Sequence, residues 1–354
     1  MDIYIYVVII TLLIQYIPVK SEKAHIIKII VSFIPIFLFG ALRINFGLDY
    51  EGYESDYYTY HSLSDWFNAI EHDEKGYVVF ARLMPTWRAL VVVQSLLVCM
   101  AYAFVFYKYV PRKYLCVAFI LLFLAGDKTI FFMFSGIRNS IAISIMLFSV
   151  PLILKRRLIP FIGTTLLAMS FHTSAVLVMP ILYIICGRRI VTKGELWLWG
   201  VAILFLAFTP LDNIASEILP FMNNNFDRYD TYMETAKEIG DNRSLAVYVS
   251  SLLMSAFLLI SAYESKVFED SISIKKLAII FPCSDLLGAM NGRLYLYVVI
   301  LLIIGLVNLL KDEKKPMIKW GATSIIIFYL AYSFFNVFLS TNAIIYSHYQ
   351  SILF

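Results

Sequence analysis

Long apolar runs recur from one end of the chain to the other, and they restrict its fold more than any other feature. Hydrophobic residues make up 60% of the sequence and charged residues only 15%. A run of about 20 apolar residues is long enough to cross a bilayer as a helix. No polar block between the runs is long enough to fold with a core of its own. We therefore predict a single all-α, polytopic integral membrane domain over residues 1–354.

The apolar runs predict about twelve transmembrane helices. Several central ones, notably 114–126, 157–171 and 173–186, are shorter than an upright span requires, and short segments usually line a cavity inside the protein. Residues 76–88 are apolar but contain two arginines and a proline, which predicts a re-entrant or interfacial segment. The predicted spans are 2–18, 24–42, 89–108, 114–126, 131–152, 157–171, 173–186, 195–210, 244–262, 275–290, 293–310 and 317–336.

Basic residues indicate which ends of these spans face the cytoplasm, because loops rich in lysine and arginine stay inside. With twelve spans, six basic clusters that hold 19 of the 29 lysines and arginines fall on one side. Both termini and the two larger loops, 43–88 and 211–243, are then expected outside. The six clusters are at 20–28, 108–113, 155–157, 188–193, 266–276 and 311–319.

This predicted topology limits the chemistry. The cytoplasmic loops are too short for a nucleotide-binding domain, and the sequence has neither a P-loop nor a dinucleotide fingerprint. The four cysteines lack paired or metal-ligand spacing, so we interpret them as buried small hydrophobes. We expect no metal, no cofactor and no nucleic-acid partner. A reaction at the outer face would need a substrate that is already activated and is delivered within the membrane. The acidic, tyrosine-rich outer loops suit a glycan, although tyrosine is also typical of the interfacial aromatic belt.

Four arginines violate the inside rule, since each is predicted at or near the outer end of a span: Arg43, Arg138, Arg228 and Arg293. The guanidinium fork binds phosphate bidentately even where water is scarce. Several arginines converging there would suit the diphosphate head of a polyprenyl-linked substrate. The alternative is that each arginine pairs with a nearby carboxylate and is purely structural. The nearby carboxylates are Asp49, Asp127, Asp227 and Asp285.

His172 is predicted in the outer turn between two short spans. An ionisable side chain at membrane depth costs roughly 2.5–3.5 kcal/mol, so it is a functional hypothesis by default. A neutral imidazole there could accept a proton from an attacking hydroxyl. The alternative is that His172 satisfies the exposed backbone of the turn, with Thr173 as the helix N-cap. Asp49 and Glu74 are alternative bases or hydroxyl ligands.

Five stretches of the sequence, in this order and spacing, carry a resemblance to a known family. They are ALRINFGLDYEGY (41–53), SGIRNSIAISIMLFSVPLILKRR (135–157), LLAMSFHTSAVLVMPILYII (166–185), FDRYDTYM (226–233) and YSHYQSILF (346–354). Together they resemble the EpsG family of Wzy-like polysaccharide polymerases over most of the chain. The family usually has glutamine after the arginine of the GIR motif, where this chain has Asn139. This departure leaves the arginine in place.

The resemblance implies a bacterial inner-membrane glycosyltransferase of the polymerase type, with a GT-C-like architecture and an active site facing the periplasm or exterior. Such enzymes join O-antigen, capsule or exopolysaccharide repeat units on undecaprenyl diphosphate without a metal. The implied partners are undecaprenyl-diphosphate-linked oligosaccharides, as donor and acceptor, together with membrane lipid and a chain-length regulator protein. The positions that match the family are Arg43, Asp49, Tyr50, Arg138, His172, Arg228 and Tyr229.

The predicted reaction is attack by the non-reducing-end hydroxyl of an incoming lipid-linked repeat on the anomeric carbon of the growing chain. Arg138 and Arg43 would stabilise the departing diphosphate, with help from Arg293. His172, or Asp49 if the histidine is structural, would position or deprotonate the hydroxyl. The residues expected to bind substrate are Arg43, Tyr50, Glu74, Arg138, Arg228, Tyr229 and Arg293.

Three other activities fit a polytopic membrane protein. A lipid-linked oligosaccharide flippase would be expected to show an internal repeat and polar groups in both halves of the membrane, and the sequence shows neither. A glycan acyltransferase would need an entrance for its acyl donor on the basic face, where none is evident. An O-antigen ligase shares nearly every physical feature of a polymerase and differs in its acceptor.

Overall fold

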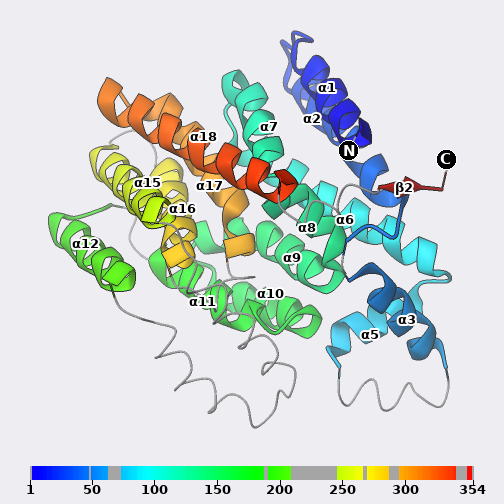
Figure 1. Cartoon of the computed structure of the whole chain (residues 1–354). Coiled ribbons are helices and arrows are strands. Elements are labelled where there is room, and N and C mark those ends of the chain that lie inside the picture. The colour runs from blue at the N-terminus through cyan, green and yellow to red at the C-terminus, as the bar shows by residue number, and fades with distance from the viewer. Residues whose placement is uncertain are drawn as a thin grey trace. The chain divides into compact units, whose positions relative to one another are not determined.

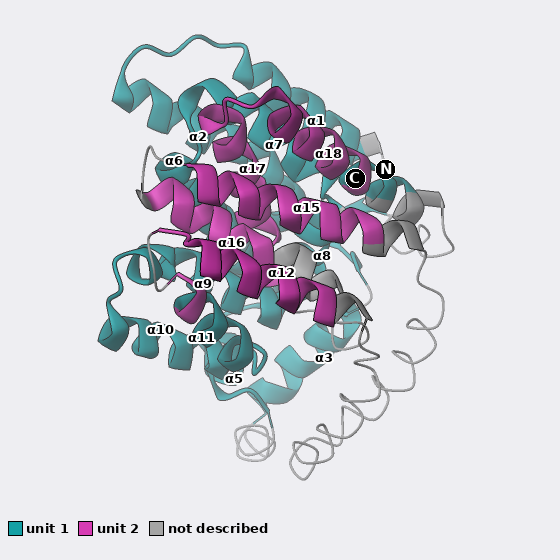
Figure 2. Cartoon of the chain, turned by 90° about the vertical axis from the view of Figure 1, so that its left-hand side faces the viewer, with its two compact units in different colours: residues 1–183, 330–354 teal, residues 184–329 magenta. Residues whose placement is uncertain are grey.

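The computed structural model describes residues 2–47, 49–62, 73–186, 190–208, 245–265, 269–286, 295–339 and 349–352. These residues are mostly helical, as predicted, and Figure 1 shows the order of the elements. The chain divides into two compact units, Met1–Tyr183 with Leu330–Phe354, and Ile184–Tyr329, coloured teal and magenta in Figure 2. The assignment of residues 1–354 to a single membrane domain stays a prediction.

The first unit begins with α1 (Asp2–Gln15), which packs against α2 (Glu22–Ala41). The Ser21 side chain caps α2 by accepting a hydrogen bond from the Ala24 amide at 3.1 Å. Strand β1 (Arg43–Ile44) follows and pairs antiparallel with β2 (Gln350–Ser351). This short sheet joins the end of the first long span to the end of the chain.

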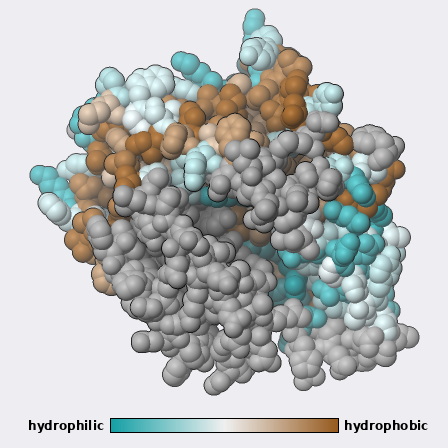
Figure 3. Space-filling view, viewed as in Figure 1, coloured by the Kyte–Doolittle hydropathy of each residue, from teal (hydrophilic) through white to brown (hydrophobic). Residues whose placement is uncertain are grey.

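Helices α3 (Tyr50–His61), α5 (Lys75–Leu83) and α6 (Trp87–Tyr109) form an aromatic core in the first unit. Tyrosines recur along α3 with helical spacing, which places them on one buried face: Tyr50, Tyr53, Tyr57 and Tyr60. They pack with Tyr77 of α5 and Trp87 of α6. These rings build the core and present no open face for a sugar. In Figure 3 hydrophilic side chains gather over the outer face of α3.

A broken helix occupies the middle of the first unit. Helix α7 (Leu115–Leu124) leads through the π-helical turn η2 (Asp127–Phe131) into α8 (Phe132–Ser135), with a bend of 74°. The chain leaves helical geometry at Gly136 (φ −90°, ψ 78°), and α9 (Ile137–Leu154) begins at the next residue. The predicted span 131–152 is therefore interrupted near its N-terminal end.

The two short helices that flank His172 are α10 (Leu158–Phe171) and α11 (Ala175–Ile185). Their lengths of 14 and 11 residues correspond to about 21 and 16 Å, which is less than the hydrocarbon thickness. In the described residues, three helices are long and apolar enough to cross a membrane: α2, α6 and α9. The bent pair α7–α8 raises that number to four. The count of twelve spans and the re-entrant segment stay predictions.

The second unit contains α12 (Lys193–Phe208), α15 (Leu245–Glu264), α16 (Glu269–Leu286), η4 (Tyr295–Tyr297), α17 (Val299–Asp312) and the first part of α18 (Pro316–Leu339). Helix α16 packs against α15 and α17. Two lysines predicted in a cytoplasmic basic cluster lie fully buried on α16 instead. Lys275 pairs with Asp312 at 3.5 Å and Lys276 pairs with Glu195 at 2.6 Å. These pairs compensate the buried charges.

Candidate functional site

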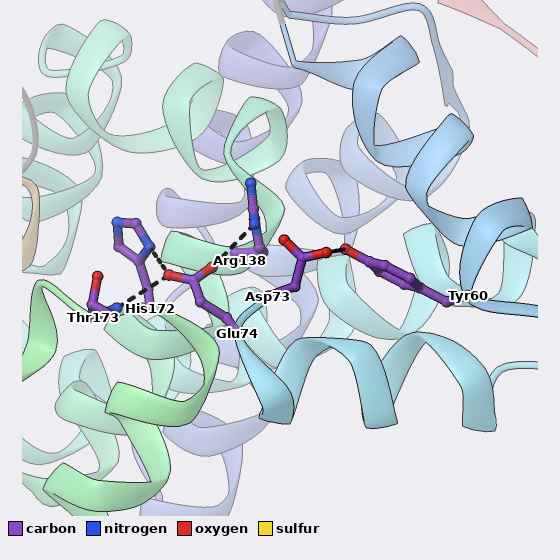
Figure 4. A network of polar contacts seen from close by, with 6 residues as sticks. All are labelled: Tyr60, Asp73, Glu74, Arg138, His172 and Thr173. Atoms are coloured by element: carbon purple, nitrogen blue, oxygen red, sulfur yellow. Dashed lines mark hydrogen bonds and ion pairs between the residues drawn. The ribbon is translucent and has the colours of Figure 1, made fainter. Parts of the chain in front are cut away.

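The carboxylate of Glu74 is the centre of the polar cluster shown in Figure 4. Its Oε1 atom accepts hydrogen bonds from His172 Nδ1 at 2.8 Å and from the Thr173 backbone amide at 3.1 Å. Its Oε2 atom lies 3.3 Å from Arg138 Nη1. Glu74 immediately precedes α5, but its side chain does not cap that helix. The carboxylate is therefore free to join α9 to the α10–α11 turn.

Gly76 allows α5 to approach the end of α10 closely enough for these contacts. A Cβ atom at this position would lie 2.2 Å from Ser170 Oγ and 2.9 Å from the Ser170 carbonyl carbon. At the end of α10, His172 adopts extended backbone geometry (φ −158°, ψ 121°) and ends the helix. The first turn of α5 and the last residues of α10 thus bring Glu74 and His172 together.

Burial and charge set the ionisation state of the cluster. The side chains of Glu74, His172 and Arg138 are 15%, 12% and 21% exposed. Burial acts to raise the pKa of Glu74, but the His172 hydrogen bond, the nearby positive charges and the Thr173 amide outweigh it and lower the pKa. An ionised carboxylate can only accept hydrogen bonds, so His172 Nδ1 is the donor and Nε2 is the acceptor of the neutral ring.

Arg138 lies in the first turn of α9, directly after the Gly136 break. Its guanidinium carbon is 5.3 Å from the ring centre of Tyr53 and 5.7 Å from that of Tyr77. Two aromatic rings and the Glu74 carboxylate thus fix the arginine. The carboxylate that pairs with Arg138 is therefore Glu74 and not one of the four aspartates that the sequence offered as structural partners.

A second polar contact adjoins the cluster. The Tyr60 hydroxyl donates a hydrogen bond to Asp73 Oδ2 at 3.1 Å. Burial strongly raises the pKa of Tyr60 and of Tyr77, so both hydroxyls stay protonated. Sequence reasoning missed Asp73, Tyr53, Tyr60 and Tyr77. The helical spacing of the tyrosines was the available signal, since it predicts one buried face on α3.

Arg43 lies in a different environment. It is fully buried, and its guanidinium donates to Gln94 Oε1 at 3.0 Å, to Ser95 Oγ at 2.8 Å and to the Gly40 carbonyl. Among the described residues, Arg43 has no carboxylate partner within ion-pair distance. It contacts none of Glu74, Arg138 and His172.

Two further predicted site residues, Asp49 and Tyr50, contribute no hydrogen bond or ion pair to the Glu74 cluster. Asp49 is exposed at the start of α3. Tyr50 is buried, and its hydroxyl accepts a hydrogen bond from Trp87 Nε1 at 3.1 Å. Arg228, Tyr229 and Arg293 lie outside the described residues. The structure therefore brings together three of the predicted site residues.

The turn between α10 and α11 differs from the structural alternative for His172. The Thr173 amide is satisfied by Glu74, and the His172 ring also bonds to Glu74. Helix α11 begins at Ala175, so the residue at its N-cap position is Ser174 and not Thr173. Within the described part of the chain, no group of three His, Cys, Asp or Glu side chains could hold a metal ion.

Comparison with known proteins identifies the family. The model of the EpsG family matches residues 26–351, which is nearly the whole chain. No curated protein and no solved structure matches the chain. The apolar helices are consistent with a membrane polymerase family. The chain belongs to the EpsG family of Wzy-like polysaccharide polymerases and is a membrane protein.

Proposed function

We propose that this protein transfers a growing glycan from undecaprenyl diphosphate to the non-reducing end of an incoming lipid-linked repeat unit. The reaction takes place at the outer face of the bacterial inner membrane. The EpsG family match supports polymerase chemistry in general. The observation that carries the proposed site is the Glu74 carboxylate, which contacts both His172 and Arg138.

In the proposed reaction, His172 takes the proton of the attacking hydroxyl. The hydroxyl oxygen forms a bond to the anomeric carbon while its proton moves to Nε2 of the imidazole. The imidazolium that results is stabilised by the Glu74 carboxylate 2.8 Å from Nδ1. A carboxylate that orients a histidine and stabilises its cation in this way is familiar from catalytic triads.

Arg138 stabilises the leaving group in this scheme. The bond between the anomeric carbon and the diphosphate oxygen breaks, and its electron pair stays on the diphosphate. A positive group fixed in advance near that oxygen lowers the barrier. Arg138 suits this role because it is held by Glu74 and two tyrosine rings yet keeps 21% of its side chain exposed. We include no metal in the reaction, since guanidinium groups can supply the positive charge.

The remaining predicted residues have different parts in this proposal. Arg228 and Arg293 are further diphosphate ligands, and Tyr229 binds the glycan. Asp49 is a hydroxyl ligand at the exposed start of α3. Arg43 is too deeply buried to touch substrate, so we propose a positioning role for it and for Tyr50. The GT-C-like architecture and a chain-length regulator partner are part of the same proposal.

Reconstitution tests the function directly. The purified protein in liposomes is incubated with a defined undecaprenyl-diphosphate-linked repeat, and products are separated by length. We expect a ladder of longer chains from the unaltered protein, and its loss in Arg138→Ala and His172→Ala at matched protein amounts. Arg157→Ala is the control, since Arg157 is exposed away from the cluster.

Three results would contradict the proposal. Normal ladders from both site variants would remove the site assignment. Transfer to an unrelated acceptor without chain growth would indicate a ligase. Movement of the lipid-linked repeat across the bilayer without any longer product would indicate a flippase.

A further inference from the structure

A buried polar relay runs from Arg43 to the break in the α8–α9 helix. Gln94 of α6 is the central residue, and its side chain is fully buried. Its Oε1 atom accepts from Arg43 Nη2 at 3.0 Å. Its Nε2 atom donates to the Met133 carbonyl at 2.7 Å and to Ser140 Oγ at 2.6 Å. Both ends of one amide are therefore in use.

The two groups bound by Gln94 Nε2 lie on opposite sides of Gly136. Met133 belongs to α8, before the break, and Ser140 to the first turn of α9, after it. Ser140 Oγ in turn donates to the Ile137 carbonyl at 2.8 Å. A broken helix exposes backbone groups that need partners inside a membrane protein. One amide group thus links both sides of the break.

Arg43 fixes the orientation of that amide. Because the guanidinium can only donate, it holds the oxygen of Gln94 toward itself and directs the nitrogen toward the break. Arg43 is itself held by Ser95 Oγ at 2.8 Å and by the Gly40 carbonyl. The backbone carbonyl of Arg43 accepts a hydrogen bond from Arg88 Nη1 at 2.7 Å. A reversed amide would place two donors against each other.

We propose that Gln94 is a positioning residue that holds the α8–α9 break in the geometry in which Arg138 reaches Glu74. Arg138 is the second residue of α9, two residues from the Ser140 that Gln94 binds. Arg43 acts in the same relay by orienting the Gln94 amide. Only the catalytic consequence of this inference rests on the proposed function. The hydrogen bonds of the relay lie within the first unit and do not depend on that function.

Two substitutions of Gln94 separate the halves of the relay. Gln94→Glu keeps an acceptor for Arg43, and the new carboxylate pairs with that buried cation, but it loses both donations across the break. Gln94→Leu loses these three contacts and also the 3.4 Å hydrogen bond that Ser95 Oγ donates to Gln94 Oε1. Ser149→Ala is the matched control, since it removes one buried hydroxyl of α9 that, among the described residues, bonds within its own helix, to the Met146 carbonyl at 2.7 Å.

Hydrogen exchange measured by mass spectrometry on the purified full-length protein tests the positioning without using activity. We expect peptides covering 130–141 to exchange about tenfold faster in Gln94→Glu and Gln94→Leu, because the break opens locally. Peptides from α10 and the Ser149→Ala protein should exchange as in the unaltered protein. Wild-type exchange at 130–141 in Gln94→Glu would overturn the proposal.

Kinetics test the catalytic consequence. A misplacement of about 1 Å costs about 10²-fold in turnover, so Gln94→Glu should lower kcat by that order and leave KM within about twofold. In an Arg138→Lys background the same change should have little further effect, since both act on one group. Equal fractional losses in the two backgrounds would overturn a role through Arg138. If the Gln94 variants show the exchange change but the unaltered protein forms no polymer, the proposed function is refuted and the relay stands.

Discussion

Arg138 and Arg43 are two arginines of the same unit with the same predicted role and opposite environments. Arg138 pairs with a carboxylate, contacts two tyrosine rings and keeps a fifth of its side chain exposed. Arg43 is fully buried and bonds only to neutral oxygens among the described residues. In our proposal, the first meets the substrate and the second holds the protein's own segments together.

The comparison shows that an arginine predicted at a membrane boundary can be either partly exposed or fully buried. What separates the two arginines is the partner of each guanidinium and the exposure that remains. A buried cation loses its hydration, and hydrogen bonds to neutral partners offset part of that cost while fixing the segments that carry those partners. A cation that is both paired and accessible can still bind an incoming anion.

Replacing each arginine should give the largest contrast. We expect Arg138→Ala to lower kcat by about 10²–10³-fold, the usual cost of removing one preorganised electrostatic donor, with only a small loss in Tm because Glu74 keeps its bonds to His172 and Thr173. Arg43→Ala should lower Tm by more, by several degrees, because Gln94 and Gly40 lose a donor and a cavity remains, and should slow turnover only through the geometry of the helix break. Turnover and thermal unfolding of both purified proteins measure the contrast. A stable, inactive Arg43→Ala protein would reverse the assignment.

Glu74→Gln tests the carboxylate that sets Arg138 apart. We expect a loss of about 10²-fold in kcat, because the amide cannot stabilise a protonated His172. The pH dependence of stability has a definite sign. The folded protein lowers the pKa of Glu74 below its ordinary 4.5, so its stabilisation is present at neutral pH and is lost as the pH falls through the lowered value.

The difference in Tm between the unaltered protein and Glu74→Gln should therefore be full at pH 7 and should shrink below about pH 4.5. Thermal unfolding across this range measures it. A difference that grows on acidification would mean that the carboxylate is destabilising when charged.

Gly76→Ala should separate the two helices that create the Arg138 environment. The added methyl group would meet Ser170, at a cost of about 1–3 kcal/mol or a shift of α5 away from α10. We expect activity to fall by about tenfold or more. Gly163→Ala in α10 is the matched control, because a Cβ atom there has no neighbour within 4 Å. Equal activity of the two variants would show that the close approach is unimportant.

The smallest effect is expected at the tyrosines around Arg138. Among the described residues, the buried Tyr77 hydroxyl has no hydrogen-bond partner, so Tyr77→Phe should leave stability unchanged or slightly higher. Tyr60→Phe removes the bond to Asp73 and should cost about 1 kcal/mol. Chemical unfolding of the two variants compares them. A large loss in Tyr77→Phe would indicate a partner for that hydroxyl.

Local pattern predicted several parts of this molecule. The helices before and after His172 begin and end within two residues of the predicted segments 157–171 and 173–186. Arg138 and His172 were singled out because an ionisable group at membrane depth is costly, and Glu74 was considered as an alternative base or hydroxyl ligand. Helix positions and unusual charges can be predicted from a short segment, because they depend on the hydrophobic pattern and the charges of that segment alone.

The meeting of those residues could not be predicted from local pattern. Glu74 and His172 are 98 positions apart, and their contact depends on the absence of a side chain at Gly76. The break at Gly136 falls inside an apolar run that reads as continuous helix. The burial of Arg43 could not be predicted, because its partner Gln94 lies within another apolar run and carries no charge that would indicate a contact.

A double-mutant cycle on Glu74 and His172 tests the central claim most directly. Turnover of Glu74→Gln, His172→Ala and the double variant is measured on one lipid-linked substrate at one pH. If Glu74 acts through His172, the double variant will turn over almost as fast as His172→Ala. Any further loss will be small and will reflect the contact of Glu74 with Arg138. A double variant slowed by the full product of the two single losses would show that the two residues act independently, and would contradict a shared site.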